Sequence, residues 1–213
     1  WNCRTLRDKD IAEMFERKNL NVLGLCETRL RESGEYKLTG STGMALSRAD
    51  PKGGGGVGVV FDTERMRLVG SKYINERLMY ARLALLKSKL NGIAGNSKLT
   101  GIDEQITLFV VVAYAPTSTA SDSAKDAFYS QVEAAVQACK SDEKLLILGD
   151  FNARFGREAH QSAQGIGRWT VAEATCENGE RLASFINKYD LTAVNTTFDV
   201  AERKLHTWRH PNT

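Results

Sequence analysis

The sequence lacks the features that mark membrane proteins, disulfide scaffolds and zinc sites. It has no signal peptide and no apolar run long enough to cross a membrane. Its four cysteines form no CxxC pair and no spacing typical of metal ligands, so we expect reduced thiols and an intracellular protein, with the nucleus as one option. The glycine run at residues 53–56 lacks the Lys-Ser/Thr pair of a P-loop and precedes a strand pattern, which favours a flexible turn.

A strong charge of either sign is also missing. The 29 Lys and Arg residues exceed the 26 Asp and Glu residues by three, which gives a net charge of +3. This charge is compatible with a polyanionic partner but is too small to establish one. The 213 residues are 42% hydrophobic and 26% charged, as in ordinary globular domains, and we expect a single domain over residues 1–213.

Apolar patterning predicts strands in pairs, broken by helices. Short apolar runs predict strands within residues 21–27, 53–62, 78–86, 106–116, 144–150 and 191–198. Apolar stripes at helical spacing predict helices within residues 7–20, 121–139 and 178–190, with Asn178 a candidate cap of the last. Residues 88–105 are polar and contain glycine, so we interpret them as a long hairpin loop. The mixed order indicates an α/β domain.

The segment "KLLILGDFNARFG", residues 144–156, raises the first question of function. Its apolar run is typical of a strand buried on both faces, and it ends in Asp150 with Asn152 two residues later. If the strand continues, the two side chains share a face at a sheet rim, where α/β proteins place ligand sites. A carboxylate there could activate a water, and an amide could stabilise an oxyanion. A local Asx turn explains the same two residues equally well.

Three more polar residues stand near the ends of predicted strands or at the start of the chain. Glu27 follows an apolar run, and Mg²⁺ is often held by only one or two carboxylates with water and substrate phosphate. Taken alone, Glu27 is more simply a strand-end residue paired with Arg29. Asn2 is in isolation a helix cap, and Tyr114 a packing residue whose hydroxyl reaches water.

Taken together, these residues indicate a catalytic site more strongly than any one of them does alone. Asn2, Glu27, Tyr114 and the pair Asp150 and Asn152 each lie at or just beyond the end of an apolar run. They supply a metal ligand, a base, an amide donor and a phenol. That set is what metal-assisted attack of water on a phosphodiester requires.

Several motifs also carry a family resemblance, and they occur in the family's order along the chain. They are "WNCRTL", "LGLCETRL", "GGVGVVF", "VVVAYAPT", "LLILGDFNARFG", "ENGERLASFINKYDLTAVNTTF" and "HTWRHP". With them the chain resembles the endonuclease/exonuclease/phosphatase superfamily, of the exonuclease III, apurinic endonuclease and DNase I type. Within that superfamily it is most similar to endonuclease domains of non-LTR retrotransposons and to craniofacial development protein 2-like proteins.

The resemblance implies a fold and an activity. The fold is a four-layer α/β sandwich of two packed mixed β-sheets flanked by helices. The activity is Mg²⁺-dependent phosphodiester cleavage, with Mn²⁺ as an alternative ion. The implied partner is DNA, bound by a monomeric domain of a longer chain that does not enter a membrane.

The resemblance also implies a role for each matching residue. Glu27 matches the glutamate that binds the metal, and Asp150 the aspartate that orients or activates the water. Asn152 matches the asparagine that stabilises the pentacovalent phosphate. Tyr114 matches the active-site tyrosine near the scissile phosphate, and Asn2 the strand-end asparagine that supports the site.

Four further residues are weaker candidates. Thr207 matches a Thr-Trp position of the family, which the resemblance places in a supporting role. Arg154, Arg157 and Arg168 lie in or after the "GDFNARFG" motif and could contact the phosphate backbone. Surface solubility explains these three arginines equally well.

One part of the family pattern is missing. Family members continue with a strand that bears an aspartate and with a Ser-Asp-His segment, and neither precedes the end of the chain at Thr213. We therefore expect a domain that is incomplete at its C-terminus and trimmed at its N-terminus, and that is inactive as these 213 residues alone. The predicted function is a DNA-nicking endonuclease of retrotransposon type. The alternatives are a phosphatase of the same fold, acting on a small or lipid phosphate, and a catalytically inactive binding remnant.

Overall fold

The computed structural model of the chain divides into two compact units. The larger unit comprises Trp1–Ala115 and Ser130–Asp150, and the smaller one Pro116–Tyr129 and Phe151–Thr213. The structure describes residues 2–3, 8–38, 40–52, 54–86 and 106–201. The predicted loop at residues 88–105 and the Thr207 position lie outside the described residues. One domain over the whole chain stays a prediction.

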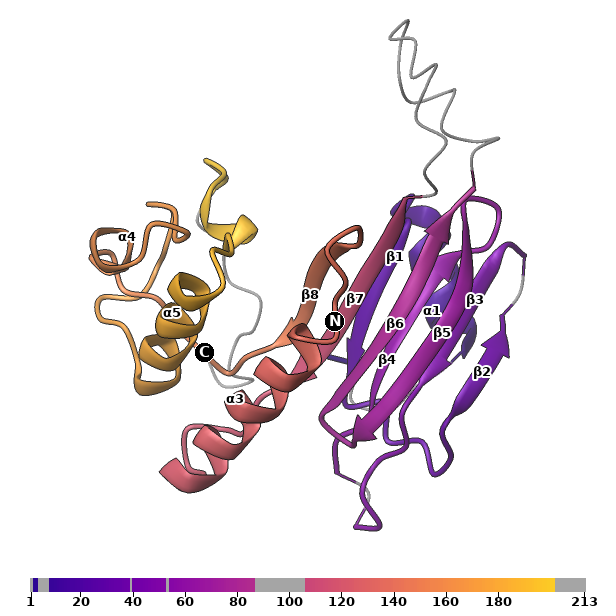
Figure 1. Cartoon of the computed structure of the whole chain (residues 1–213), viewed down its shortest axis with the longest axis horizontal. Helices are drawn as coiled ribbons and strands as arrows, with labels where there is room; N and C mark the ends of the chain where they lie inside the picture. Colours follow the sequence, from indigo (N-terminus) through magenta and orange to yellow (C-terminus); the bar gives the residue numbers. More distant parts are fainter. Residues whose placement is uncertain (1, 4–7, 39, 53, 87–105, 202–213) are drawn as a thin grey trace, which may run out of the picture. The chain divides into compact units, whose positions relative to one another are not determined.

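The larger unit is built from two four-stranded sheets (Figure 1). The first has the order β1-β4-β3-β2 and contains β1 (Val22–Cys26), β2 (Gly34–Lys37), β3 (Thr42–Leu46) and β4 (Val57–Asp62). Its neighbouring strands are antiparallel, and a parallel bridge between Asn2 and Cys26 makes the pairing mixed. Asn2 and Cys3 therefore lie along the β1 edge of this sheet.

The second sheet has the order β5-β6-β7-β8. It contains β5 (Met66–Asn75), β6 (Leu78–Leu85), β7 (Thr107–Tyr114) and β8 (Lys144–Asp150). The pairs β5–β6 and β6–β7 are antiparallel, whereas β7 and β8 are parallel. The parallel pair brings the C-terminal ends of β7 and β8 to the same edge of the sheet.

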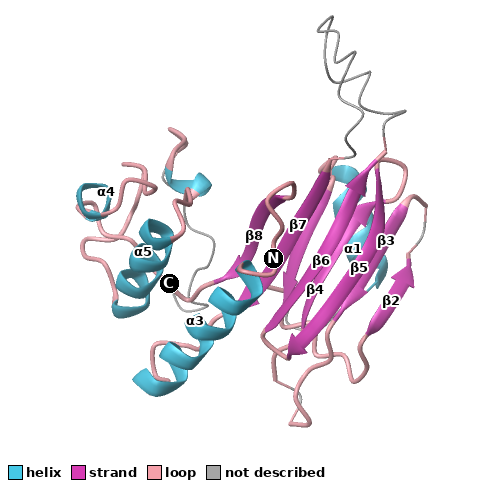
Figure 2. Cartoon of the chain, in the orientation of Figure 1, coloured by secondary structure: helices cyan, strands magenta, loops and turns pink. Residues whose placement is uncertain are grey.

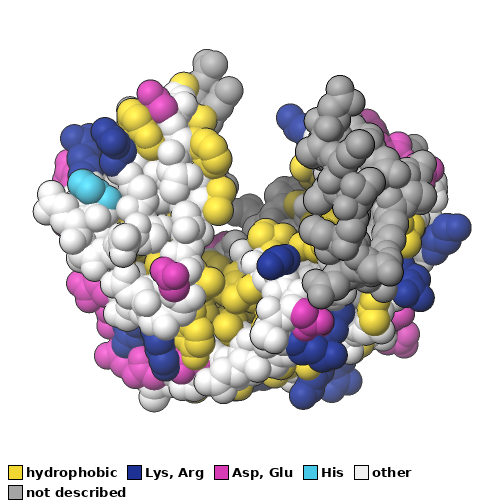
Figure 3. All heavy atoms as spheres, turned by 45° about the horizontal axis from the view of Figure 1, so that its top comes forward, with side chains coloured by type: hydrophobic (Ala, Val, Ile, Leu, Met, Phe, Trp, Pro, Cys, Tyr) yellow, Lys and Arg dark blue, Asp and Glu magenta, His cyan; other side chains and the backbone are white. Residues whose placement is uncertain are grey.

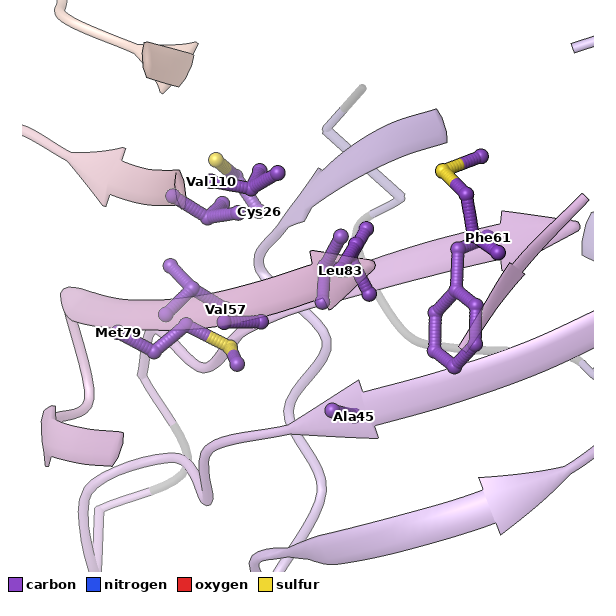
Figure 4. Close-up of a cluster of buried hydrophobic side chains, with 11 residues drawn as sticks. Cys26, Ala45, Val57, Phe61, Met79, Leu83 and Val110 are labelled. Atoms are coloured by element: carbon purple, nitrogen blue, oxygen red, sulfur yellow. The ribbon is translucent and has the colours of Figure 1, made fainter. Parts of the chain in front are cut away.

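The two sheets pack face to face around the main core (Figure 4). The first sheet contributes Cys26, Ala45, Val57, Val59 and Phe61, and the second Met66, Met79, Ala81, Leu83, Val110 and Val112. Full burial of a large apolar side chain contributes about 1.5 to 3 kcal/mol. At one point the sheets leave no room for a side chain, because a Cβ on Gly24 would lie 2.7 Å from the Leu148 Cβ.

A helix covers the outer face of the first sheet. In α1 (Asp8–Arg17), Ile11 and Phe15 are buried against Leu25, Met44, Leu46 and Val60. Because both faces of this sheet are covered, its inner strands are apolar at successive positions rather than at alternate ones. The helix predicted within residues 7–20 from its apolar stripe is confirmed.

The second sheet is flanked by the C-terminal half of α3 (Asp122–Val136) and the turn after it. The Arg82 guanidinium on β6 donates to the Glu143 carboxylate at 2.6 Å and to the Ala138 carbonyl at 2.7 Å. Asn75 at the end of β5 donates to the Gln131 side chain at 2.7 Å. Two packed sheets with flanking helices confirm the predicted fold class.

The strand β8 is less buried than its sequence predicts. Residues 145–148 are only half-buried, because β8 is an edge strand of its sheet in the described part of the chain. The prediction of burial on both faces is therefore wrong. The apolar surroundings of Cys26 and Cys139 in the sequence predict buried thiols. All four cysteines are free, and Cys26 is fully buried, whereas Cys139 is only half-buried.

The smaller unit consists of short helices and loops (Figure 2). It contains α4 (Ala159–Ser162), α5 (Glu177–Lys188) and a 3₁₀ turn, η1 (Val194–Thr196), around a core of Ala159, Ala163, Ile166 and Ile186. The strand predicted at residues 191–198 is wrong. The Thr196 hydroxyl donates to the Ala193 carbonyl at 2.6 Å, a local bond that competes with extended pairing. None of the described helices has the length and apolar character needed to cross a membrane.

Candidate active site

Glu27 directly follows β1 in an unusual backbone conformation. Its φ is 59° and that of Arg29 is 55°, in the left-handed region that non-glycine residues rarely adopt. Each such residue costs of the order of 1 to 2 kcal/mol. The turn is held by the Thr28 N–H on the Gly56 carbonyl and the Arg29 N–H on the Gly55 carbonyl, both at 3.1 Å. Strained residues of this kind concentrate at functional sites.

The glycine-rich segment before β4 makes this turn fit. Gly56 has a φ of 85°, and a Cβ on it would lie 2.3 Å from the Thr28 hydroxyl oxygen. Any side chain there would push the turn that carries Glu27 away from β4. The segment therefore serves the geometry of the turn, in agreement with its interpretation as a turn rather than a phosphate-binding loop.

The Glu27 carboxylate is the meeting point of three donors. Its Oε1 accepts hydrogen bonds from the Asn2 amide and from the Tyr114 hydroxyl, the latter at 3.0 Å. Its Oε2 accepts from Arg29 Nη2, also at 3.0 Å. The structure thus brings together Asn2, Glu27 and Tyr114 from three parts of the sequence. Asn2 is bridged to β1 and is not the cap of α1, which begins at Asp8.

These contacts determine the protonation states of the Glu27 carboxylate and the Tyr114 hydroxyl. Partial burial alone would raise the pKa of Glu27, but the hydrogen bonds from Asn2, Tyr114 and Arg29 outweigh it and lower that pKa. Burial and the hydrogen bond to Glu27 raise the pKa of Tyr114 to about 12. At neutral pH the site therefore holds an ionised carboxylate beside a phenol that keeps its proton and acts as a donor.

Asp150 lies at the same sheet edge as Tyr114. The two residues are register partners in the parallel β7–β8 pair, and the Ala115 N–H donates to the Asp150 carbonyl at 2.8 Å. Gly149 allows this pairing, because a Cβ there would lie only 1.8 Å from the Ala113 carbonyl oxygen. The glycine of the "LGDFNA" motif is thus required by the close approach of β7.

Arg77 is a residue of this site that the sequence did not single out. Its guanidinium carbon lies 5.0 Å from the centre of the Tyr114 ring, within the range of a cation–π contact. The Tyr114 N–H donates to the Arg77 carbonyl at 2.8 Å. Arg77 lies in the turn between β5 and β6, and nothing in its local sequence marks it, because the contact depends on the pairing of β6 with β7.

Asn152 does not continue the strand that ends at Asp150. Its φ is 46°, so the argument that residues 150 and 152 share a strand face is wrong. In the smaller unit the Asn152 carbonyl accepts a hydrogen bond from Asn178 Nδ2 at 3.1 Å. Asn178 is buried and is not the cap of α5, whose N-cap residue is Cys176. The Asn152 carbonyl is therefore bound by a buried asparagine that the sequence pattern had indicated as a helix cap.

The three candidate arginines all lie in the smaller unit and are exposed. Arg154, Arg157 and Arg168 belong to the loops around α4. On the face drawn in Figure 3, basic side chains are interspersed with acidic ones rather than gathered in a single stripe. This exposure agrees both with phosphate contact and with solubility.

Metal-binding groups are sparse around this site. In the described ranges, no three or more His, Cys, Asp or Glu side chains are grouped so that they could hold a metal ion. Among the described residues, Glu27 directly after β1 and Asp150 at the end of β8 each carry a carboxylate. Any ion there would depend on few protein ligands.

The comparison with protein families decides the classification. The model of the Endonuclease/Exonuclease/phosphatase family matches residues 1–211. The chain belongs to this family. Membership indicates a hydrolase of the nuclease or phosphatase type and confirms the resemblance noted in the motifs.

Two curated relatives match the whole chain. The chain is 24% identical to craniofacial development protein 2 of Bos taurus and 23% identical to that of Tragulus javanicus, each over 216 residues. Both alignments include 100% of this chain, but only 33% and 34% of the relatives. The chain therefore spans about a third of the length of these relatives.

A solved structure supports the fold. The catalytic domain of Xenopus laevis APE2 superimposes with a TM-score of 0.50 and 15% sequence identity. The match covers 73% of this chain and 58% of that domain. At this identity the similarity concerns the fold alone, which agrees with the two packed sheets described above.

Proposed function

We propose that this chain is the catalytic part of a metal-dependent phosphodiesterase that nicks DNA, of the retrotransposon endonuclease type, with water as the nucleophile. The observation that carries the proposal is the Glu27 carboxylate, held ionised by Asn2, Tyr114 and Arg29. A carboxylate prepared in this way, together with Asp150 at the end of β8, suits a site that handles phosphate and a cation. DNA is the proposed partner, bound by a monomeric domain of a longer protein in the nucleus.

The donor set fits Mg²⁺, with Mn²⁺ as the alternative. Mg²⁺ retains several waters and commonly uses one or two carboxylates plus substrate phosphate. Glu27 offers one ionised, oriented carboxylate, and the Arg29 side chain on its Oε2 is 45% exposed and can turn away. A bound ion would supply neutralisation of the phosphate charge and polarisation of its oxygens.

The protein groups have complementary roles in this proposal. The Asp150 carboxylate orients the attacking water and takes its proton. The Tyr114 phenol and the Asn2 amide hold Glu27 in place, while the Asn152 amide donates to the phosphate as negative charge develops. Loss of one such donor typically costs about 10²- to 10³-fold in rate. Arg154, Arg157 and Arg168 are the proposed contacts to the DNA backbone.

A phosphatase acting on a small or lipid phosphate is the second candidate. The small net charge of +3 favours it, because binding of a long polyanion depends on many basic side chains in contact with phosphates. Both activities need an attacking water and a cation at the phosphate. They differ in the substrate, because nicking cleaves a phosphodiester of a long polymer and the phosphatase cleaves a phosphate monoester.

The test compares both substrates with one preparation. The full-length protein that carries this chain is incubated with supercoiled plasmid and with a soluble phosphate monoester, in Mg²⁺ and in EDTA. We expect Mg²⁺-dependent nicking that Asp150→Asn lowers by at least about 10²-fold, while the exposed Asp142→Asn leaves it unchanged. Monoester hydrolysis without nicking would establish the phosphatase, and no turnover of either substrate would establish the inactive remnant.

A further inference from the structure

Asn178 joins two loops of the smaller unit through one side chain. Its Nδ2 donates to the Pro116 carbonyl at 3.0 Å and to the Asn152 carbonyl at 3.1 Å. Both partners are acceptors, so the NH₂ group and not the amide oxygen must face them. The residue is only 3% exposed, and its Oδ1 has no hydrogen-bond partner among the described residues. An aspartate of the same shape could not make either bond.

The two carbonyls hold equivalent places in the sequence. Pro116 lies two residues after Tyr114, and Asn152 lies two residues after Asp150. Tyr114 and Asp150 are register partners at the ends of β7 and β8. Asn178 therefore binds both segments just past the point where strand pairing ends.

The first turn of α5 is itself firmly held. Glu177 accepts a bond from the buried Lys125 ammonium at 2.8 Å, and the Tyr129 hydroxyl donates to the Asn178 carbonyl at 3.4 Å. One turn later, Arg181 contacts the Asp126 carboxylate at 2.9 Å. These contacts to the first half of α3 fix the position of Asn178 within the unit.

The loop that contains Asn152 lies directly against this turn. A Cβ on Gly179 would be 2.3 Å from the Arg154 carbonyl oxygen, and the Cys176 N–H donates to that same carbonyl at 3.1 Å. Asn152 itself has a φ of 46°, a conformation that surrounding contacts must maintain. The Asn178 amide provides the side-chain contact on its carbonyl.

We infer that Asn178 is a positioning residue of the reaction, which acts by fixing the backbone of Asn152 and of the segment after Tyr114. The inference rests on the proposed function, in which the Asn152 amide stabilises the phosphate. Asn178 itself touches no substrate. A donor that is displaced by about 1 Å loses about 10²-fold of its effect, so the anchor controls the rate and not substrate binding.

The test uses Asn178→Asp in the full-length protein. The matched control is Asn187→Asp in the same helix, because Asn187 Nδ2 also donates to a backbone carbonyl, that of Ser162 at 3.1 Å. We expect Asn178→Asp to lower the kcat of DNA nicking by about 10- to 100-fold and to leave the KM for DNA within about twofold of the wild type. Asn187→Asp should change neither value. Asn178→Ser, which introduces no charge, is measured in parallel as a second variant.

A double-mutant comparison separates positioning from general loss of structure. In an Asn152→Ala background, Asn178→Asp should lower kcat by less than about threefold further, because the group that it positions is already absent. An equal fall in both backgrounds overturns the inference, as does wild-type kcat in both Asn178 variants.

Hydrogen exchange tests the anchor separately from the proposed function. If the wild-type protein fails to nick DNA, the proposed function and the catalytic role of Asn178 are lost together, and exchange still shows whether Asn178 holds the Asn152 segment. The Asn178 variants should speed amide exchange in residues 151–156, while exchange in β6 and β7 stays at the wild-type rate. Unchanged exchange in residues 151–156 contradicts the anchor.

Discussion

Replacing Tyr114 with phenylalanine tests the arrangement around Glu27. The substitution removes the hydroxyl that donates to Glu27 Oε1 at 3.0 Å and leaves the ring, with its Arg77 contact, in place. Asn2 and Arg29 still donate to the carboxylate. The change therefore isolates one hydrogen bond to a charged group.

The expected loss follows from the burial of this bond. Hydrogen bonds to charged groups contribute about 1.5 to 3 kcal/mol. The Glu27 side chain is 16% exposed and keeps two donors, so we expect the lower part of this range, about 1.5 to 2 kcal/mol at pH 7. For a protein of this size that corresponds to a fall in Tm of roughly 3 to 8 °C.

The loss of unfolding free energy in Tyr114→Phe should become smaller as the pH falls. The Tyr114 hydroxyl helps to lower the pKa of Glu27 in the folded state from its ordinary value of 4.5. A lowered pKa adds stability above pH 4.5, and this stability disappears as the carboxylate is protonated at lower pH. Tyr114→Phe should therefore cost less free energy of unfolding at pH 3 than at pH 7.

The assay is urea unfolding of both proteins at the two pH values, in EDTA so that no metal ion contributes. Tyr73→Phe is the control, since the Tyr73 hydroxyl accepts a bond from the neutral Ser71 side chain at 3.2 Å. Its cost should be smaller and nearly equal at both pH values. An equal cost of Tyr114→Phe at pH 3 and pH 7 would refute the hydrogen bond to an ionised Glu27.

Two further predictions concern the framework of the site. Gly149→Ala should destabilise the protein by about 3 kcal/mol in urea unfolding, because the new Cβ would lie 1.8 Å from the Ala113 carbonyl oxygen. Gly70→Ala, with nothing within 4 Å of the new Cβ, is the control, and equal effects would contradict the close approach. The hydrogen bond from Lys125 is the main cause that lowers the pKa of Glu177 to about 2, so its stabilisation is present above pH 4.5 and lost toward pH 2. Glu177→Gln should lower Tm at pH 6 but not at pH 2, and a Tm loss that is the same at both would count against this ion pair.

The sequence predicted the strands that contain a clear apolar run. The strands β1, β4, β6, β7 and β8 were expected from such runs, and α1 from its stripe. By contrast, β2, β3 and β5 were not predicted. β2 is short and largely exposed, and many side chains of β5 are polar or exposed. β3 is fully buried, but its sequence TGMAL is short and begins with Thr and Gly, so its apolar signal is weak.

Local hydrogen bonding explains the strand that was predicted wrongly. Residues 191–198 contain β-branched and apolar side chains, which favour a strand. The hydroxyls of Thr196 and Thr197 instead bond to the carbonyls three residues earlier and stabilise a 3₁₀ turn. The composition of this segment does not show whether the strand or the 3₁₀ turn is the more stable conformation.

In the candidate site, too, the sequence indicated the residues that a local pattern marks and not those that depend on tertiary contacts. Glu27, Tyr114 and Asp150 were singled out because each stands at the end of an apolar run, and strand ends of packed sheets gather at a rim. The contacts of Arg77 with Tyr114, and of Asn178 with Pro116 in the smaller unit, were not predicted, because they join segments 37 and 62 residues apart in the chain. Such contacts depend on tertiary packing, which a local pattern does not record.

The central claim is that Glu27 is the metal ligand of a DNA-nicking site. The most direct measurement is plasmid nicking as a function of Mg²⁺ concentration by the full-length protein, its Glu27→Gln variant and its Glu64→Gln variant, in which the exposed Glu64 is the control. We predict that Glu27→Gln raises the half-saturating Mg²⁺ concentration by at least about tenfold and lowers the maximal rate, since it removes the charge that attracts the ion. A Glu27→Gln protein with the Mg²⁺ dependence and rate of the wild type would contradict the claim.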